Sequence, residues 1–477
     1  MSLHKWYEDA VFYHIYTLSL AGAGFRNDYA ATSHKLSYME KWIPHIKELG
    51  CDTVLLGPAL KSLSHGYDVT DYFNVDNRIG TNEELRSLVD CFHKHGLRVV
   101  LDCVFNHCGR DFFAFQGLLH GNRDYVAWFS GVDFSQSSPL GDPFTYDAWS
   151  GHYELVKFNL GNEATRCYLL DAARFWVDSF DIDGMRLDSA NVLDFDFMRV
   201  LRQTMLAMKP DFWLMGEVVG GDYTKWVAPG ILDSVTNYIL FKSLFSSHNQ
   251  NNLYELAHCL QQSRPDNGLP LYNFLDNHDQ PRIASNVSDI AHLRTLYALL
   301  FTLPGIPSIY YGSEWGISGV KENGSDQPLR PYIDIANPSA DGTNLTAFIR
   351  NLSALRREQT ALKYGGYRQV YLEYRRPFVF ERFYESERIF VAVNIADNED
   401  TVDLSRKVST AGGQTSQATQ ADQISQVSQV SQTSRVGDIA VQPADLVGSF
   451  IDLMTGETVS PRKVRIPPHT ARLLKLQ

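Results

Sequence analysis

The sequence predicts an α/β fold, a parallel (β/α)₈ TIM barrel, followed by an antiparallel β domain. Three observations lead to this prediction. Short apolar strands alternate with amphipathic helices from residue 1 to about 350. Eight such strands can be recognised, which is the number that closes a barrel of this type. Polar and charged residues stand at the ends of four of these strands, where barrels of this type place their functional groups.

The strand candidates are short apolar runs, rich in β-branched and aromatic residues and bounded by turn or polar residues. In chain order they are Val11–Thr17, Thr53–Gly57, Arg98–Val104, Gly184–Asp188, Trp213–Glu217, Ser234–Tyr238, Leu269–Leu275 and Pro307–Tyr311.

Helices are predicted between these strands. In the segment 36–49, apolar residues recur at helical spacing. The next helix begins with a capping box, Thr81-x-x-Glu84, and ends at Gly96.

One connection is too long for a simple loop. About fifty residues rich in Gly, Ser, Asp and aromatic residues separate the third strand from a helix near 164–180. A structureless loop of that length is uncommon in a compact domain. We therefore predict an inserted subdomain at 108–159, so that the barrel comprises 1–107 and 160–364.

After this barrel the hydrophobic pattern changes to alternating β runs, which predict an antiparallel β domain over 365–477. Inside it, residues from about 408 to 436 are almost all Ser, Thr, Gln, Gly, Ala and Val, a composition that cannot build a core. The clearest β runs are Phe378–Phe383, Ile389–Asn394, Val464–Pro467 and Ala471–Leu476.

The bulk composition narrows the class of partner. A net charge of −12 disfavours nucleic acid and anionic membranes and suits a neutral substrate. No apolar run is long enough to span a membrane, and the N-terminus lacks the pattern of a signal peptide. The six cysteines show no metal-ligand spacing. We expect a cytoplasmic protein with free thiols, whose oligomeric state the sequence leaves open.

The strongest local signal is the fourth strand, which ends Gly184-Met-Arg186-Leu-Asp188. Residues two apart on a strand point to the same side. Arg186 and Asp188 should therefore face one cavity, where the arginine keeps the aspartate ionised and ready to act as a nucleophile.

Three other strand ends should converge on the same cavity. The third strand continues from Asp102 to His107, the fifth ends at Glu217, and the seventh leads to Asp276-Asn-His-Asp279. A single acid at a barrel mouth is as well explained by a structural ion pair as by function. Because buried charges are costly unless they are paired or functional, the whole set predicts an active site.

Paired carboxylates of this kind suit the cleavage of glycosidic bonds. A retaining enzyme places a nucleophilic carboxylate and an acid/base carboxylate about 5–5.5 Å apart. Adjacent strands lie about 4.8 Å apart, so Asp188 and Glu217 can supply that separation. Glu217 needs a raised pKa to hold its proton, and a nearby anionic Asp188 raises it.

These motifs resemble the α-amylase superfamily, glycoside hydrolase family 13. The resemblance covers the whole chain and includes Asp102-Cys-Val-Phe-Asn-His107, Gly184–Asp188, Gly216-Glu217 and Phe274-Leu-Asp-Asn-His-Asp279. It implies that Asp188 is the nucleophile and Glu217 the acid/base. It also implies that Asp279 is the third carboxylate, that His107 and His278 bind sugar hydroxyls, and that Arg186 supports the nucleophile.

Two further motifs extend this resemblance. His65-Gly-Tyr67-Asp68 resembles the family segment in which the tyrosine is a stacking platform for the sugar at the cleavage point. Asp326-x-Pro-x-Arg330 resembles a loop of cyclodextrin- and maltodextrin-degrading members. In those members residues like Asp68 and Arg330 pair to close the pocket, and we adopt that pairing as a hypothesis here.

The residues after Asp188, Ser-Ala-Asn191-Val, look like the neopullulanase and cyclomaltodextrinase branch. The resemblance implies a retaining α-glucan hydrolase acting on maltodextrins or related α-1,4-linked oligosaccharides. The alternatives are a transglycosylase or α-1,6-glucosidase of the same superfamily and, more distantly, a non-catalytic sugar-binding relative. No cofactor is needed for this chemistry. Many members hold a structural calcium through an asparagine that matches Asn106, which leaves such an ion open.

Overall fold

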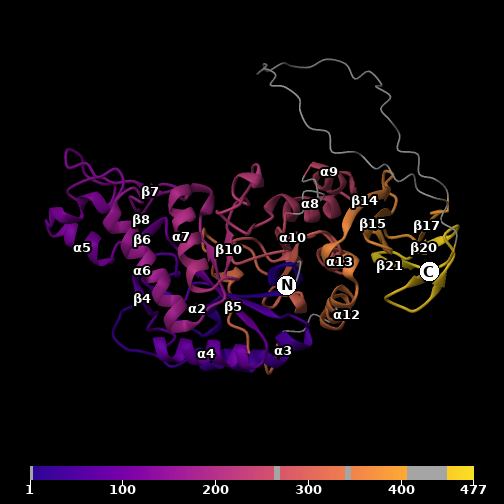
Figure 1. Cartoon of the computed structure of the whole chain (residues 1–477), viewed down its shortest axis with the longest axis horizontal. Coiled ribbons are helices and arrows are strands. Elements are labelled where there is room, and N and C mark those ends of the chain that lie inside the picture. Colours follow the sequence, from indigo (N-terminus) through magenta and orange to yellow (C-terminus); the bar gives the residue numbers. More distant parts are fainter. Residues whose placement is uncertain (1–3, 263–268, 339–344, 406–447) are drawn as a thin grey trace, which may run out of the picture.

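The computed structural model describes residues 4–262, 269–338, 345–405 and 448–477. Within these residues, eight parallel strands form the central sheet (Figure 1). They are β1 (Phe12–Ile15), β2 (Thr53–Leu56), β5 (Arg98–Cys103), β9 (Gly184–Leu187), β10 (Trp213–Gly216), β11 (Ser234–Val235), β12 (Tyr272–Phe274) and β13 (Ile306–Tyr310).

The sheet closes into a barrel. Its strand order is β11-β10-β9-β5-β2-β1-β13-β12, so each strand pairs with its neighbours in chain order. A parallel bridge between Thr236, just after β11, and Tyr272 of β12 joins the two edges. Each of the eight predicted strands is present, and the predicted fold class is confirmed.

Helices surround these strands (Figure 1). The predicted segment 36–49 is helical but begins as the 3₁₀ helix η1 (Leu36–Trp42) before α3 (Ile43–Glu48). The other α-helices of the barrel region are α1 (Trp6–Asp9), α2 (Thr17–Leu20), α4 (Asn82–Lys94), α6 (Glu163–Phe180), α7 (Phe195–Met208), α8 (Tyr238–Asn249), α9 (Tyr254–Gln262), α10 (Ile283–Asn286), α11 (His292–Thr302), α12 (Leu345–Glu358) and α13 (Thr360–Tyr364).

The capping box at the start of α4 is present as predicted. The Thr81 side chain accepts a hydrogen bond from the Glu84 amide, and the Glu84 carboxylate accepts one from the Thr81 amide. The helix ends at Lys94, and Gly96 follows with a φ of +72°, a left-handed conformation that favours glycine.

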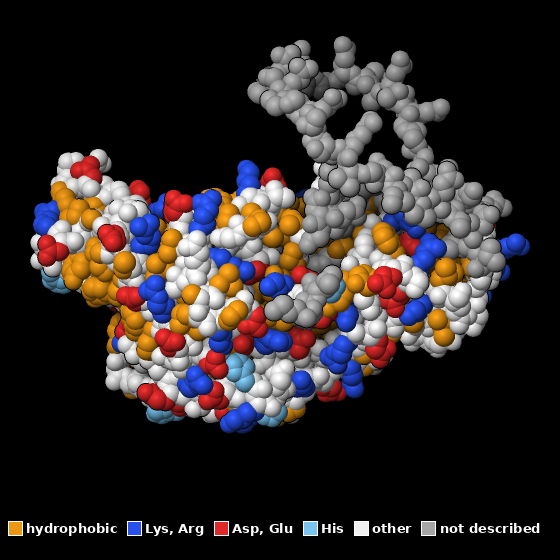
Figure 2. Space-filling view, viewed as in Figure 1, with side chains coloured by type: hydrophobic (Ala, Val, Ile, Leu, Met, Phe, Trp, Pro, Cys, Tyr) orange, Lys and Arg blue, Asp and Glu red, His pale blue; other side chains and the backbone are white. Residues whose placement is uncertain are grey.

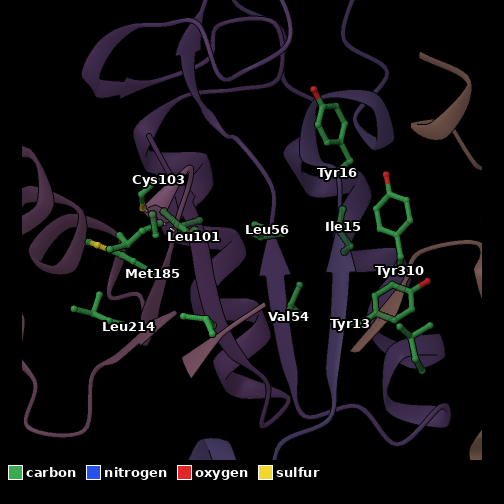
Figure 3. Close-up of a cluster of buried hydrophobic side chains, with 14 of the residues drawn as sticks. Tyr13, Ile15, Tyr16, Val54, Leu56, Leu101, Cys103, Met185, Leu214 and Tyr310 are labelled. Atoms are coloured by element: carbon green, nitrogen blue, oxygen red, sulfur yellow. Dashed lines mark hydrogen bonds between the residues drawn. The ribbon is translucent and has the colours of Figure 1, made fainter. Parts of the chain in front are cut away.

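Strand residues alternate between the outside and the inside of the barrel. Side chains such as Ile15, Leu56 and Met185 belong to the large core shared with the helices (Figure 3). Their neighbours along the strands form a second buried cluster that includes Phe12 and Trp213. Because these two rings lie 4.9 Å apart although β1 and β10 are not paired strands, this second cluster fills the barrel interior.

The long connection after β5 contains regular structure. It holds a three-stranded antiparallel sheet, β6 (His107–Gly109), β8 (His152–Lys157) and β7 (Ala148–Trp149), together with α5 (Phe113–Leu119) and η2 (Arg123–Trp128). A second small sheet that the sequence analysis did not predict pairs β3 (Leu60–Ser62) with β4 (Val69–Val75). The turn between β3 and β4 contains Tyr67 and Asp68.

The C-terminal part forms an antiparallel sheet in the order β14-β15-β16-β21-β18-β19 and lies at the opposite end of the barrel from α5 (Figure 1). A separate two-stranded sheet pairs β17 with β20. The four predicted strands are present as β15, β16, β20 and β21, whereas β14, β17, β18 and β19 were not predicted. The Ser/Gln-rich segment 408–436 lies outside the described residues. The strands are β14 (Gly366–Tyr371), β15 (Phe378–Tyr384), β16 (Glu387–Asn394), β17 (Asp400–Val402), β18 (Phe450–Asp452), β19 (Thr458–Val459), β20 (Val464–Ile466) and β21 (Thr470–Leu476).

The surface has mixed character. Figure 2 shows acidic and basic side chains intermingled over one face of the molecule, with hydrophobic side chains between them. Among the described helices, none is both long and apolar enough to cross a membrane. The six cysteines are free thiols, and Cys103 and Cys108 are buried.

Candidate active site

Arg186 of β9 lies among three carboxylates inside the barrel. Its Nη1 donates to Asp102 Oδ1 at 2.8 Å and to Asp188 Oδ1 at 3.1 Å. Its Nη2 lies 3.1 Å from Glu217 Oε2. This follows from the register, since Arg186 is paired with Asp102 of β5 on one side and with Met215, two residues before Glu217, on the other. One guanidinium therefore joins the ends of three strands.

Ser189 makes a second connection between Asp188 and Glu217. Its amide donates to Glu217 Oε2 and its hydroxyl to Asp188 Oδ2, both at 3.0 Å. The residue has a φ of +50°, which is uncommon outside glycine and costs backbone strain. Nothing in the sequence pattern distinguishes this serine, and it was not predicted as a site residue.

Burial is the main cause that raises the pKa of Asp188 well above the usual aspartate value, and the Glu217 carboxylate raises it further. Arg186 and the Ser189 hydroxyl act in the opposite direction. These two donors stabilise the ionised form of Asp188, in which it can act as a nucleophile.

Asp279 lies beyond β12 and is the most accessible of the three predicted catalytic acids, with 31% of its side chain exposed. Its carboxylate is 2.9 Å from His278 Nε2 and accepts a hydrogen bond of 2.9 Å from Arg330 Nη2. Burial alone would raise the pKa of Asp279, but His278, Arg330 and Arg186 together hold it below the ordinary value. Asp279 is therefore charged at neutral pH.

Tyr67 lies between Asp102 of β5 and His278, which follows β12. Its hydroxyl donates to Asp102 Oδ2 at 2.9 Å and also contacts His278 Nε2. Its ring stacks on that of His278 with centroids 5.3 Å apart. The turn between β3 and β4 therefore places Tyr67 against the predicted catalytic residues, although it is far from them in sequence.

His107 is almost fully buried, and this burial lowers its pKa to about 3, so the ring is neutral. Its Nδ1 lies 3.2 Å from the Asn106 side-chain nitrogen. Its Nε2 has no hydrogen-bond partner among the described residues. A buried ring nitrogen without a partner is available to a hydroxyl group of a bound ligand.

The hypothesis that Asp68 pairs with Arg330 is wrong for this structure. Asp68 accepts hydrogen bonds from the amide and the hydroxyl of Ser64, at 3.1 and 2.6 Å, within its own turn. Arg330 instead binds Asp279 and Asp326, at 2.9 and 3.1 Å. Asp68 and Arg330 thus each bind other partners, and Arg330 contacts Asp279 rather than Asp68.

A calcium ion at Asn106 is not supported by its neighbours. Calcium takes six to eight oxygen ligands, usually with several carboxylates among them. Asn106 directs its amide nitrogen toward His107. Among the described residues, the one group of three or more acidic, histidine or cysteine side chains within ligand distance is Asp289, Asp397 and His469, which does not include the surroundings of Asn106.

Besides Ser189, two further residues of the site were not predicted as participants. Asp102 was noted in its strand but given no role, although strand alternation places it on the same side as Arg186. Tyr238, at the start of α8, directs its hydroxyl to Glu217 Oε1 at 3.4 Å and accepts a hydrogen bond from Asn277 at 3.0 Å. The sequence gives no signal for Tyr238, because the predicted strand Ser234–Tyr238 has no acidic residue at its end.

Arg330→Ala is expected to lower kcat/KM on maltotriose about 10- to 100-fold, because charge-assisted hydrogen bonds are worth about 1.5–3 kcal/mol. The loss of Arg330 should also raise the pKa of Asp279. When the pH is lowered, the variant should therefore begin to lose activity at a higher pH than the wild type does. Rate measurements across pH would check both effects. Lys321→Ala, which removes a neighbouring exposed cation near Asp326, is the control. Unchanged kinetics on maltotriose would contradict the role of Arg330.

A closed parallel barrel with paired carboxylates at the C-terminal ends of its strands defines the class of barrel glycosidases. The family model of the alpha amylase catalytic domain matches residues 25–363. The chain belongs to the alpha-amylase family.

Curated relatives agree with this assignment. A cyclomaltodextrinase of Thermoanaerobacter pseudethanolicus is 31% identical over 378 residues, which are 76% of this chain and 64% of the relative. An intracellular maltogenic amylase of Bacillus subtilis strain 168 is 30% identical over 355 residues, which are 72% of this chain and 57% of the relative. The chain thus spans less than two thirds of the length of these relatives.

A solved structure covers nearly the whole chain. It is the cyclic alpha-maltosyl-(1→6)-maltose hydrolase of Arthrobacter globiformis in complex with its cyclic sugar. The TM-score is 0.79 at 26% identity, over 98% of this chain and 99% of that one.

Proposed function

We propose that the chain is a retaining α-glucan hydrolase that cleaves α-1,4-glucosidic bonds in maltodextrins or related oligosaccharides. The observation that supports this most directly is the pair formed by Asp188 and Glu217. Arg186 and Ser189 each contact both carboxylates, which holds the two acids together at neighbouring strand ends. A retaining glycosidase needs two carboxylates in this relation.

In the first step, a carboxylate oxygen of Asp188 attacks the anomeric carbon and forms a covalent glycosyl ester. The glycosidic C–O bond breaks as Glu217 gives its proton to the leaving oxygen. In the second step, Glu217 takes a proton from water, the water oxygen bonds to the anomeric carbon, and the ester to Asp188 breaks. The products keep the α configuration, because two inversions occur at one carbon.

The remaining predicted residues are assigned to substrate binding or to the support of residues that bind the substrate. Asp279 is charged and faces the site, so it suits sugar hydroxyls and the distorted ring of the transition state. Tyr67 offers its ring as a stacking surface, and the free Nε2 of His107 suits a hydroxyl group. His278 and Arg330 hold Asp279 in place. Asp68 orders the turn around Tyr67 through Ser64.

The proposal extends to the whole protein. Its partner is a neutral α-glucan oligosaccharide rather than nucleic acid or a membrane, and its location is the cytoplasm, in line with the name of the Bacillus subtilis relative. The chain divides into a barrel of 1–107 and 160–364, an insertion at 108–159 and a β domain at 365–477. The chemistry uses the protein's own side chains and no cofactor.

A second candidate is a hydrolase of cyclic glucans that contain α-1,6 as well as α-1,4 bonds. The Arthrobacter globiformis structure supports it, because that chain and this one match over almost their full lengths. A product profile on maltoheptaose, a cyclodextrin and cyclic maltosyl-maltose would separate the candidates. Proton NMR of the first product would show the α anomer if configuration is retained. If the purified protein leaves all three substrates intact, the hydrolase proposal fails.

The pH profile offers a test of the acid pair. Asp188 must be ionised to attack, and its raised pKa keeps it protonated to a higher pH. The acid limb of kcat/KM should therefore lie above pH ~3.9, the value of an ordinary aspartate. In Glu217→Gln the neighbouring charge is gone, so the limb should move to lower pH.

That measurement needs an aryl maltoside, whose good leaving group makes an acid catalyst unnecessary. Glu255→Gln, a change on α9 outside the site, should keep the wild-type profile. If the acid limb of kcat/KM lies at the same pH in Glu217→Gln as in the wild type, Glu217 does not influence the ionisation of Asp188.

A further inference from the structure

A cavity of about 440 Å³ has a lining that includes none of the predicted site residues. It is lined by the turn after α2, by η1 and by the loop after β13, through residues that include Gly22, Lys35, Tyr38, Lys41 and Tyr332. Its volume is within the range of small-ligand pockets. None of these residues takes part in the proposed chemistry.

Tyr332 is the more exposed of the two tyrosines of this cavity, with 56% of its surface accessible. Its ring stacks on Tyr38 with centroids 5.7 Å apart and planes 29° from parallel. One face of Tyr332 is thus covered and the other is open. Gly22 stands at the ring edge, where a Cβ would lie 3.8 Å from Tyr332, and its φ of +67° favours glycine.

Tyr38 gives Tyr332 a rigid support. Its hydroxyl donates to the carbonyl of Ile333 at 2.9 Å and accepts from the amide of Ile335 at 3.1 Å. Lys41 lies over the Tyr38 ring, 5.3 Å from its centroid. The aromatic pair is therefore ordered in advance, which lowers the entropy cost of binding a ligand.

The chemistry of the cavity suits a neutral polyhydroxy ligand. Lys35 Nζ already donates to the carbonyl of Gly22 at 2.7 Å, and Lys41 already lies over an aromatic ring. Each ammonium group carries three N–H donors, so both lysines keep donors for the hydroxyl oxygens of a ligand. An open tyrosine ring with hydrogen-bonding groups at its rim fits the apolar face and the hydroxyl edge of a sugar.

The cavity is connected to the catalytic centre through two chain segments. Tyr332 follows Arg330 by two residues, and Arg330 binds Asp279. The turn at Gly22 follows Tyr16, whose hydroxyl accepts from Arg330 Nη1 at 3.2 Å. We infer that Tyr332 and Tyr38 form an accessory subsite that holds distant glucosyl units of a long α-glucan while the chain is cleaved between Asp188 and Glu217. This inference rests on the proposed function.

The test is Tyr332→Ala, assayed on amylose and on maltotriose. A contact of this kind is worth about 0.5–1.5 kcal/mol, which corresponds to a rise in KM for amylose of about 2- to 12-fold. Maltotriose is too short to reach the subsite, so its kcat and KM should not change. Tyr332→Phe keeps the ring and should behave like the wild type on both substrates.

Tyr374→Ala is the matched control, since Tyr374 is 58% exposed and lies in the C-terminal β sheet region. It should leave both substrates unaffected. If Tyr332→Ala leaves the KM for amylose unchanged while the enzyme is active, the subsite is refuted and the proposed function stands. A rise of the same size in the KM for maltotriose would also refute the subsite, because it would show that Tyr332 acts through Arg330. A wild type inert on every α-glucan would overturn both.

Discussion

Asp188→Asn is expected to lower kcat on maltoheptaose by about 10⁴-fold or more, because an amide oxygen cannot form the glycosyl ester. The variant should fold normally. The amide retains the shape of the side chain, and Arg186 keeps Asp102 and Glu217 as charged partners. The change should also relieve the repulsion between two buried acids, so thermal stability should stay equal or rise.

Asp196→Asn is the matched control for this change. Asp196 lies eight residues further along the chain, is exposed and pairs with Arg199 at the surface. It should retain wild-type kcat. The measurement is the rate of reducing-sugar release from maltoheptaose, with circular dichroism to compare the folds. Comparable rates for Asp188→Asn and the wild type would remove Asp188 from the mechanism.

Arg186→Met is expected to reduce the free energy of unfolding by about 3–5 kcal/mol at neutral pH, the cost of leaving buried charges without their partner. Three carboxylates, Asp102, Asp188 and Glu217, lose the guanidinium that they share. Catalysis should be lost as well, because Asp188 would then hold its proton more firmly.

The stability effect should depend on pH in a defined direction. Burial and Glu217 raise the folded-state pKa of Asp188, and without Arg186 it rises further. An acid whose folded pKa is above its unfolded value favours the folded state at low pH and loses that contribution as pH rises. The deficit of Arg186→Met should therefore be small near pH 5 and grow toward pH 8.

Urea unfolding at both pH values would measure this deficit. Arg174→Met, which removes an exposed arginine paired with Asp171, should change stability by less than about 0.5 kcal/mol at either pH. A deficit of Arg186→Met that is the same at pH 5 and pH 8 would show that the three acids are not what the arginine stabilises.

The barrel could be predicted because its signal is local. Each strand is a short apolar run, and each long helix has a periodic apolar face or a cap such as Thr81 with Glu84. These patterns depend on neighbours in sequence. Three of the strands that were not predicted, β3, β18 and β19, have only two or three residues and depend on pairing with distant partners.

In the predicted site, too, some features depend on neighbours in sequence and others on contacts between distant segments. Arg186 and Asp188 could be placed together because strand geometry relates residues two apart. The joint contact of Arg186 with Glu217, and the donors that Ser189 offers to both acids, depend on how two strands lie side by side. The roles of these residues are predictions that the experiments above address.

The sequence by itself determined the fold class, the order of the strands and the acids that stand at their ends. It did so because periodicity and short motifs are properties of adjacent residues. Only the tertiary structure decided which partner each charge takes. Arg330 could have paired with Asp68, but Ser64 already satisfies that aspartate, whereas Asp279 and Asp326 lie within reach of the guanidinium. Buried charges pair with the nearest unsatisfied group, and distance between remote segments is set by packing rather than by sequence.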